Sequence, residues 1–214
     1  MPSQTFLRLR DEKQEIIIRA AIGEFTENGF MRARVEDIAK RAGIAKGSIF
    51  QYFENKGELF NYCAAWGLEI IMKKLDGRMN IADMDIFDLF RDAEAVFATL
   101  QEEREISAFM MIAAGEPSLP AELTHAMYEV GYDYIRQLVQ NGKKRGTIRR
   151  DIDEELIMEF FSAITNHFDR RWLHLYTGMV DGLDPESEKA LNAEITQLHE
   201  LLTSGLKGEN YVKI

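Results

Sequence analysis

The sequence predicts an all-α fold, and three observations support this prediction. Apolar residues recur at the three- and four-residue spacing of amphipathic helices along most of the 214 residues. No segment of useful length alternates apolar and polar residues as a half-buried strand does. A proline inside a periodic segment would interrupt a helix. None of the four prolines lies inside such a segment: Pro2, Pro117, Pro120 and Pro185.

About nine helices are expected in chain order. The first covers about residues 11–28, ends at Asn28-Gly29, and should bury one face made of Ile16, Ile17, Ala20, Ala21 and Phe25. Two short helices follow within residues 35–52. The remaining helices are expected at about 56–77, 81–102, 104–114, 121–145, 153–177 and 185–206.

Residues 35–56, VEDIAKRAGIAKGSIFQYFENK, hold the most informative pattern of the chain. Ile38 and Ala39 lie on the apolar face of a first short helix. Gly43 follows at a position where a chain leaving a helix adopts positive φ. The pattern therefore predicts two short helices joined by a tight glycine turn.

The second of these short helices, about residues 46–52, is poor in apolar residues. Ile49 and Phe53 are four apart and should anchor it. Its other face is small and polar: Lys46, Gly47, Ser48, Gln51 and Tyr52. A helix that docks in the major groove of DNA needs such a face, since small residues permit close approach and donors reach bases and phosphates. A helical hairpin with a solvated face is the plainer alternative.

The charge distribution is compatible with a local DNA-binding surface. The whole chain has a net charge of −10 and a pI of about 5.0. Residues 1–56, however, hold 10 Lys/Arg against 8 Asp/Glu, a net of +2, and the remainder holds 16 against 28, a net of −12. Because the electrostatic footprint of a binding surface is local, the acidic remainder does not exclude DNA binding.

The N-terminal segment resembles the DNA-binding domain of the TetR (tetracycline-repressor-like) family. The matching residues are Gly29-Phe30, Val35, Asp37-Ile38-Ala39, Ala42-Gly43-Ile44, Lys46-Gly47-Ser48-Ile49, Tyr52-Phe53, Lys56 and Leu59-Phe60. The resemblance covers about the first 60 residues closely and the rest in helical layout. It implies a helix-turn-helix DNA-binding domain at residues 1–55 and a helical ligand-binding and dimerisation domain at 56–214.

The resemblance implies a homodimeric transcriptional regulator, more often a repressor, that a small ligand releases from a palindromic operator. Seven residues are expected to contact the DNA: Arg34, Lys46, Gly47, Ser48, Gln51, Tyr52 and Lys56. Among them, Lys46 and Gln51 should read bases, while Tyr52 and Lys56 should hold phosphates.

Three positions depart from the family pattern. Arg34 and Ala45 stand where family members usually have a hydroxyl residue that caps each short helix. Because losing such a cap typically costs about 1 kcal/mol, these helices should depend more on packing. Phe50 stands where tyrosine is frequent and cannot donate a hydrogen bond to a phosphate. Arg34 is expected to supply a phosphate or minor-groove contact.

The last two helices, about 153–177 and 185–206, are expected to form the dimer interface. The first has two apolar stripes, one through Ile157 and Phe161 and one that starts at Leu156. The second has apolar residues at near-heptad spacing: Leu191, Ile195, Leu198, Leu202 and Leu206. A helix with a second stripe has more to bury than one core takes, and the resemblance implies a four-helix bundle between two copies. Packing within one chain is the alternative.

Aromatic residues and methionines are dense between the fourth and eighth expected helices. With the family resemblance, this density indicates a cavity for an apolar or amphipathic small molecule. The expected lining residues are Phe97, Phe109, Met110, Tyr128, Tyr132, Phe161, Asn166 and His167. For any single one of them, an ordinary core position is the alternative.

No catalytic, metal or cofactor site is expected. His167 and His174 are seven residues apart, about 10.5 Å along a helix, which is too far for one metal ion. The sequence has no glycine-rich phosphate loop, nucleophile elbow or cysteine cluster. A protein–protein adaptor with a vestigial DNA-binding head is the remaining alternative, and it would show no salt-dependent DNA binding.

A cytoplasmic protein without a membrane partner is expected. The single cysteine, Cys63, lies in an apolar helical context, so a buried apolar role and a reducing compartment are expected. No uncharged apolar run is long enough to span a bilayer, and residues 1–14 lack the apolar core of a signal peptide.

Overall fold

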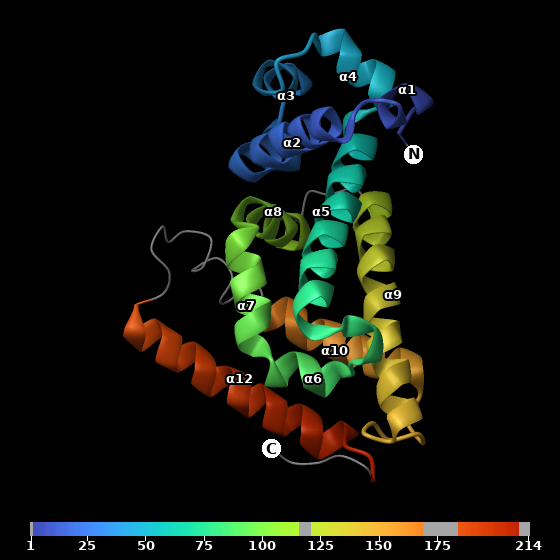
Figure 1. The fold of residues 1–214 in the computed structure, drawn as a ribbon, viewed down its shortest axis with the longest axis vertical. Coiled ribbons are helices and arrows are strands. Elements are labelled where there is room, and N and C mark those ends of the chain that lie inside the picture. The colour runs from blue at the N-terminus through green and yellow to red at the C-terminus, as the bar shows by residue number, and fades with distance from the viewer. Residues whose placement is uncertain (1, 116–120, 169–183, 210–214) are drawn as a thin grey trace. The chain divides into compact units, whose positions relative to one another are not determined.

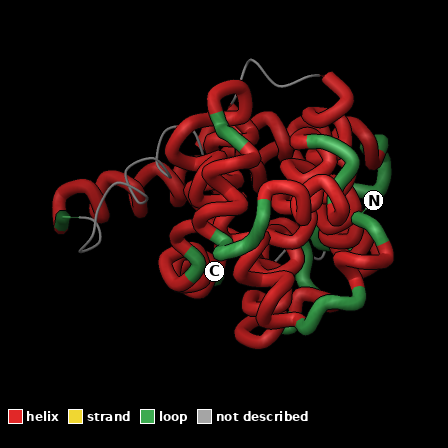
Figure 2. Tube along the Cα trace, turned by 90° about the horizontal axis from the view of Figure 1, so that it is seen from above, coloured by secondary structure: helices red, strands yellow, loops and turns green. Residues whose placement is uncertain are grey.

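The computed structural model describes residues 2–115, 121–168 and 184–209 (Figure 1). Over these residues it contains eleven α-helices and no strand (Figure 2), which confirms the all-α prediction. The helices are α1 (Gln4–Leu7), α2 (Asp11–Arg32), α3 (Val35–Arg41), α4 (Lys46–Tyr52), α5 (Lys56–Met79), α6 (Ile86–Arg91), α7 (Ala93–Glu102), α8 (Arg104–Gly115), α9 (Ala121–Arg145), α10 (Glu154–Phe168) and α12 (Pro185–Leu206). A short 3-10 turn, η1 (Ile81–Asp83), precedes α6.

The chain forms two compact units. Unit 1 contains Met1–Ile70 and Glu103–Val130, and unit 2 contains Ile71–Glu102 and Gly131–Ile214. Unit 1 therefore includes α8 in addition to the N-terminal helices. The functional boundary expected between residues 55 and 56 stays a prediction.

The core of unit 1 is an aromatic cluster shared by α2, α5 and α8. The ring centroid of Phe60 lies 5.0 Å from that of Phe25 and 5.1 Å from that of Phe109. Phe30 stacks on Phe25 from the end of α2. The cluster holds α2 against both α5 and α8, which gives the short helices α3 and α4 a fixed support.

Helix α2 buries a face slightly different from the expected one. Ile17, Ala21 and Phe25 are buried as expected, but Ile16 is exposed. The buried face of α2 also includes Ile18. Since successive residues of a helix are rotated by about 100°, Ile16 lies almost opposite the centre of this buried face. The regular helix ends near the expected glycine, since Gly29 adopts φ +66°.

The N-terminal helix α1 was not predicted. Ser3 caps it, and the Phe6 ring is completely buried against the aromatic rings of Phe53 and Tyr62, with centroids 4.8 and 5.4 Å away. Ser3 also bonds to the end of α4: its hydroxyl donates to the Gln51 carbonyl at 2.7 Å and its backbone N–H to the Tyr52 carbonyl at 2.8 Å. The segment before α2 is thus tied to the C-terminus of α4.

In unit 2, the single helix expected at residues 81–102 is divided. The Asp85 side chain accepts hydrogen bonds from the backbone N–H groups of Phe87 and Asp88, and the Asp88 side chain accepts one from the N–H of Asp85. This reciprocal capping box starts α6 as a new helix. The expectation of one helix was therefore wrong.

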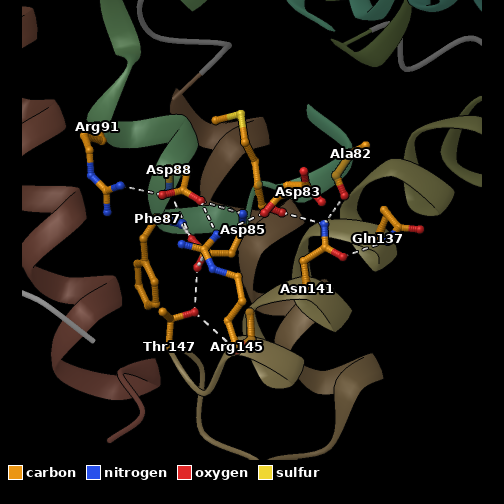
Figure 3. Close-up of polar contacts among 12 residues, drawn as sticks. Ala82, Asp83, Asp85, Phe87, Asp88, Arg91, Gln137, Asn141, Arg145 and Thr147 are labelled. Atoms are coloured by element: carbon orange, nitrogen blue, oxygen red, sulfur yellow. Dashed lines mark hydrogen bonds and ion pairs between the residues drawn. The ribbon is translucent and has the colours of Figure 1, made fainter. Parts of the chain in front are cut away.

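The start of α6 is joined to the end of α9 by polar contacts to two buried aspartates and to nearby backbone carbonyls (Figure 3). We call Asp85, Asp88, Asn141, Arg145 and Thr147 the α6–α9 corner. Arg145 donates to the Asp88 carboxylate at 2.6 Å, and the Thr147 hydroxyl donates to Asp85 at 2.5 Å. The Asn141 amide donates to the carbonyls of Ala82 and Met84, both at 2.8 Å.

The two apolar stripes expected on α10 are confirmed where the structure describes their side chains. Ile157 and Phe161 are buried, whereas Leu156 and Phe160 are exposed. The stripe on α12 differs from the expectation, because it is largely buried within its own unit: Leu191, Ile195, Leu202 and Leu206. Helix α6 lies against α12, and the Phe87 ring meets that of His199 at 6.3 Å. The proposal that this stripe forms an intermolecular face is therefore wrong for these four side chains.

Two further sequence-based expectations can be compared with the structure. Cys63 is completely buried, and burial raises the pKa of its thiol, which suits an unreactive core residue. Within the described ranges, none of the helices combines the length and apolar character needed to cross a membrane.

Candidate nucleic-acid interface

Helices α3 and α4 form the helix-turn-helix that the sequence predicts. Gly43 adopts φ +65° between them, as expected for the turn. The Ile44 N–H then donates to the Ala39 carbonyl at 3.0 Å, which closes the end of α3. A residue with a β-carbon would be strained at position 43 by this backbone conformation.

One side of α4 is anchored in the core of unit 1. Ile49 and Phe53 are buried as predicted. Tyr52 is also buried, at 8% exposure, and its ring centroid lies 5.7 Å from that of Phe6. The expected exposure of Tyr52 was wrong because α1, which covers it, was not predicted. A phosphate contact from its hydroxyl stays a prediction.

The other side of α4 is open to solvent. Lys46, Gly47 and Gln51 are exposed and Ser48 is partly exposed, in agreement with the predicted polar face. Phe50 lies exposed beside them. A β-carbon added at Gly47 would meet no other atom within 4 Å, so packing inside the protein does not require glycine there. We call Arg34 and these five α4 residues the reading face.

Neither short helix has a side-chain cap, as expected from Arg34 and Ala45. For α3, the buried carboxylate of Glu24 on α2 partly takes the place of the missing cap. It accepts the backbone N–H of Arg34 at 3.1 Å and the side-chain amide of Asn28 at 3.1 Å, and lies 3.4 Å from Arg41. Glu24 thereby ties the start and end of α3 to α2, a role that the sequence pattern did not indicate.

Two cations of the reading face share one carboxylate. Glu36, on α3, accepts from the Lys46 ammonium at 2.5 Å through one oxygen and from the Arg34 guanidinium at 3.1 Å through the other. The hydrogen bond from Lys46, and then that from Arg34, lower the pKa of Glu36. Glu36 therefore stays ionised near neutral pH and offsets part of the positive charge beside α4.

Lys56 lies elsewhere than expected. Its ammonium donates to the carbonyls of Phe30, Met31 and Ala33 at 2.6, 3.2 and 3.1 Å, and lies 4.8 Å from the centre of the Phe30 ring. It thus caps the C-terminal end of α2, and burial lowers its pKa. At the N-terminus of α5, the Asn55 side chain accepts the Glu58 N–H at 2.9 Å. A phosphate contact by Lys56 stays a prediction, but its ammonium already has three acceptors.

Other cations of the N-terminal segment have no partner in the described part of the chain. Four of the ten Lys/Arg side chains in residues 1–56 are exposed and make no hydrogen bond or ion pair there: Arg8, Arg10, Lys13 and Lys40. Sequence-based reasoning did not single them out. Arg8 and Arg10 follow the α1 segment that is tied to α4, so they are additional candidates for phosphate contact.

The residues expected to line a ligand cavity are distributed over both units. Phe109 belongs to the buried aromatic cluster of unit 1 and Met110 follows it on α8, whereas Phe161 packs against Phe90 in unit 2, with ring centroids 6.1 Å apart. Tyr132, on α9 in unit 2, is partly exposed. The side chains of the other four lie outside what the structure describes: Phe97, Tyr128, Asn166 and His167.

A pocket of about 500 Å³ opens at another place in unit 2. Its lining consists of Gly146, Ile148, Arg149, Arg150, Asp151, Lys207, Gly208 and Glu209. None of the expected ligand-binding residues contributes to it. The predicted cavity therefore stays a prediction.

This combination of a glycine turn, a supported α3 and an exposed α4 defines a helix-turn-helix of the kind that binds DNA. The sequence model for "Bacterial regulatory proteins, tetR family" matches residues 17–63, which include α3, α4 and most of α2. The match covers the interface but not the rest of the chain.

Comparisons over a larger part of the chain extend this relationship. The chain is 46% identical over 167 residues to the fatty acid metabolism regulator protein of Bacillus subtilis (strain 168), covering 73% of this chain and 81% of that protein. It is 36% identical over 181 residues to the protein named probable acrEF/envCD operon repressor of Escherichia coli (strain K12), covering 81% of each. The fold is similar to that of the transcriptional regulator FadR from Bacillus subtilis in complex with stearoyl-CoA, with a TM-score of 0.67, 21% identity, and coverage of 89% of this chain and 98% of that one.

The chain therefore belongs to the tetR family of bacterial regulatory proteins. It is a DNA-binding transcriptional regulator, and these two relatives carry the names of a regulator and a repressor.

Proposed function

We propose that this protein is a homodimeric repressor that binds a palindromic operator through two copies of α4 and is released by an apolar or amphipathic ligand. The observation that carries the proposal is the composition of α4. Its buried side is anchored by Ile49 and Phe53, while Lys46, Gly47 and Gln51 are exposed. A helix that presents small and polar residues outward from a fixed support suits the major groove.

Within the reading face, different residues have different proposed roles. Lys46 and Gln51 read base edges, and Ser48 adds a polar contact. Gly47 allows the helix backbone to approach closely. The exposed Phe50 ring offers apolar surface to a thymine methyl group, since it has no hydroxyl to donate to a phosphate. Arg34 contributes a phosphate contact beside α4.

The dimer is proposed to form through α10 and α12. Leu156 and Phe160 are 58% and 45% exposed one helical turn apart on α10, and Leu201 on α12 is 65% exposed. Large apolar side chains of this kind often mark an interaction surface. We propose that these three side chains, rather than the buried stripe of α12, form the apolar part of the interface. Two linked heads about 34–36 Å apart would read successive major grooves of a palindrome.

Sedimentation equilibrium tests this interface. The variant Leu156→Glu/Phe160→Glu should shift the protein toward monomer, because each dimer would bury four additional carboxylates. The control Glu155→Gln/Glu159→Gln changes two exposed α10 residues and should leave the dimer intact. An unchanged association constant in the Leu156/Phe160 variant would place the interface elsewhere.

The effector is proposed to be a molecule with a long apolar part. Phe161 and Phe90 pack against each other in unit 2, and Tyr132 is the other proposed lining residue of that unit whose side chain the structure describes. A structural relative is described in complex with stearoyl-CoA, which has such an apolar chain. We therefore propose long-chain acyl compounds as the first class to test, by displacement of the protein from its operator.

The DNA-binding proposal is tested by selection from randomised duplex DNA, followed by sequencing, at two salt concentrations. A palindromic site whose affinity falls with salt is the expected result. Gln51→Ala should then change the preferred bases within each half-site. No enriched site, with no salt-dependent binding in ligand-stripped protein, would favour the adaptor with a vestigial head.

A further inference from the structure

The carboxylate of Glu36 lies between the two cations of the reading face that come from different elements. Arg34 immediately precedes α3, and Lys46 begins α4. Both donate to Glu36, at 3.1 and 2.5 Å, and all three side chains are exposed. In the free protein, Arg34, Lys46 and Glu36 together therefore carry one net positive charge, whereas the two cations alone would carry two.

We propose that Glu36 suppresses binding to DNA of arbitrary sequence and thereby raises the preference of the reading face for its operator. The inference rests on the proposed DNA-binding role of α3 and α4. It assigns a role in specificity to an acidic residue, whose charge the DNA phosphates repel.

Complexes with arbitrary DNA and complexes with the operator depend on different contacts. Binding to arbitrary DNA depends almost entirely on neutralising phosphates with Lys and Arg. Glu36 opposes this in two ways: it holds the cations that would meet phosphates, and it places a negative charge beside them. Both effects weaken complexes that have only phosphate contacts.

In the operator complex, the same carboxylate also has a favourable effect. The Lys46 side chain has four rotatable carbon–carbon bonds, and the bond to Glu36 restricts its conformations before DNA arrives. A restricted side chain loses less conformational entropy when it bonds to a base. The repulsion is therefore partly offset at the operator but not on arbitrary DNA.

The structural contribution of this ion pair is expected to be small. Pairs between exposed side chains contribute little to folding stability, and Asp37 also lies 3.9 Å from Arg34. Glu36→Gln keeps the size of the side chain and should fold normally, so its DNA affinity can be interpreted directly.

A matched control is available in the same unit. Glu27 is also exposed and forms an ion pair with Arg41, which is not among the proposed DNA contacts. Glu27→Gln removes the same charge from unit 1 without releasing a cation of the reading face. Comparing the two variants separates the local effect of Glu36 from a change in net charge.

The experiment measures binding of wild type, Glu36→Gln and Glu27→Gln to a random-sequence duplex and to the selected operator across a salt series. Glu36→Gln should bind the random duplex about three- to tenfold more tightly at low salt, with a slope of log affinity against log salt steeper by about 0.9. Its operator affinity should change by less than about twofold, so the specificity ratio falls. Glu27→Gln should change neither affinity by more than about twofold.

The effect should also depend on the two cations. In an Arg34→Gln/Lys46→Gln background, adding Glu36→Gln should strengthen random-duplex binding no more than Glu27→Gln does. An unchanged specificity ratio in Glu36→Gln, or an equal effect of Glu27→Gln, would overturn the inference. If wild-type protein bound neither duplex, the proposed DNA-binding function would fail first, which is a distinguishable result.

Discussion

Asp or Glu side chains pair with Lys or Arg both beside the reading face and in the α6–α9 corner, but the two sets of pairs differ in exposure and in the number of partners. Glu36 is 46% exposed on its side chain and bonds to two flexible cations. Asp88 is 8% exposed and bonds to Arg91, Arg145 and the backbone N–H of Asp85. Exposed, sparsely bonded charges can exchange partners with DNA, whereas buried ones hold two helices together.

Breaking the α6–α9 corner should give the largest effect on folding. Asp88→Ala removes half of the capping box and leaves Arg145 and Arg91 without this carboxylate. We expect the free energy of unfolding in urea to fall by about 3 kcal/mol. Asp133→Ala, which breaks the exposed pair with Arg136 in the same unit, serves as the control and should leave the midpoint unchanged. Equal losses in the two variants would remove the distinction drawn above.

Lys56 tests the comparison inside unit 1, because it is a cation with structural partners close to the reading face. Lys56→Met keeps a side chain that can pack on Phe30 but loses three charge-assisted hydrogen bonds to the end of α2. We expect a loss of about 2 kcal/mol in the free energy of unfolding. Lys40→Met, at an exposed cation on α3, should be neutral. A fully stable Lys56→Met that had lost DNA binding would instead support the original phosphate role.

Acid should weaken the α6–α9 corner. Burial raises the pKa of Asp88. The hydrogen bonds that its carboxylate accepts from the Asp85 N–H and from Arg145 lower this pKa by more, so the pKa is below the ordinary value of 3.8. A carboxyl with a lowered folded-state pKa contributes stability that is complete above its unfolded-state pKa. That contribution is lost as the pH falls through the folded-state pKa. At pH values below about 4, the free energy of unfolding should therefore decrease as the pH falls. This decrease should be less steep in Asp88→Asn. Identical pH profiles would contradict this assignment.

Gly47→Ala should have the smallest effect on folding, and its two effects should have opposite signs. Alanine favours helix by up to about 1 kcal/mol over glycine, and no atom inside the protein obstructs the added methyl group. The free energy of unfolding of Gly47→Ala should therefore be slightly higher than that of the wild type. If α4 approaches DNA closely at this position, binding should weaken for all sequences. Gly77→Ala, at another unobstructed helical glycine, is the control and should leave DNA binding unchanged.

The parts of the site that sequence reasoning predicted depend on local signals. Gly43 needs positive φ, and the spacing of Ile49 and Phe53 determines which side of α4 is buried, so both followed from adjacent residues. The capping box of Asp85 and Asp88 is local too, and its three-residue spacing could have revealed the start of α6.

The parts that sequence reasoning missed depend on contacts between distant residues. Tyr52 is buried because Phe6, 46 positions earlier, covers it. Lys56 is occupied by carbonyls that are 23 to 26 residues away. The α12 stripe has the same spacing whether it meets its own unit or another copy. Periodicity identifies a face that will be buried, but it does not identify the partner that buries it.

The most direct test of the central claim is to measure both stability and DNA affinity for Lys46→Gln. Lys46 is exposed, and its ammonium is held only by Glu36 among the described residues. We expect an unchanged urea midpoint and a loss of operator affinity of about tenfold or more, because Lys46 would lose a base contact. A destabilised variant, or one that binds the operator as wild type does, would contradict the claim that the exposed charges of α4 serve DNA recognition rather than folding.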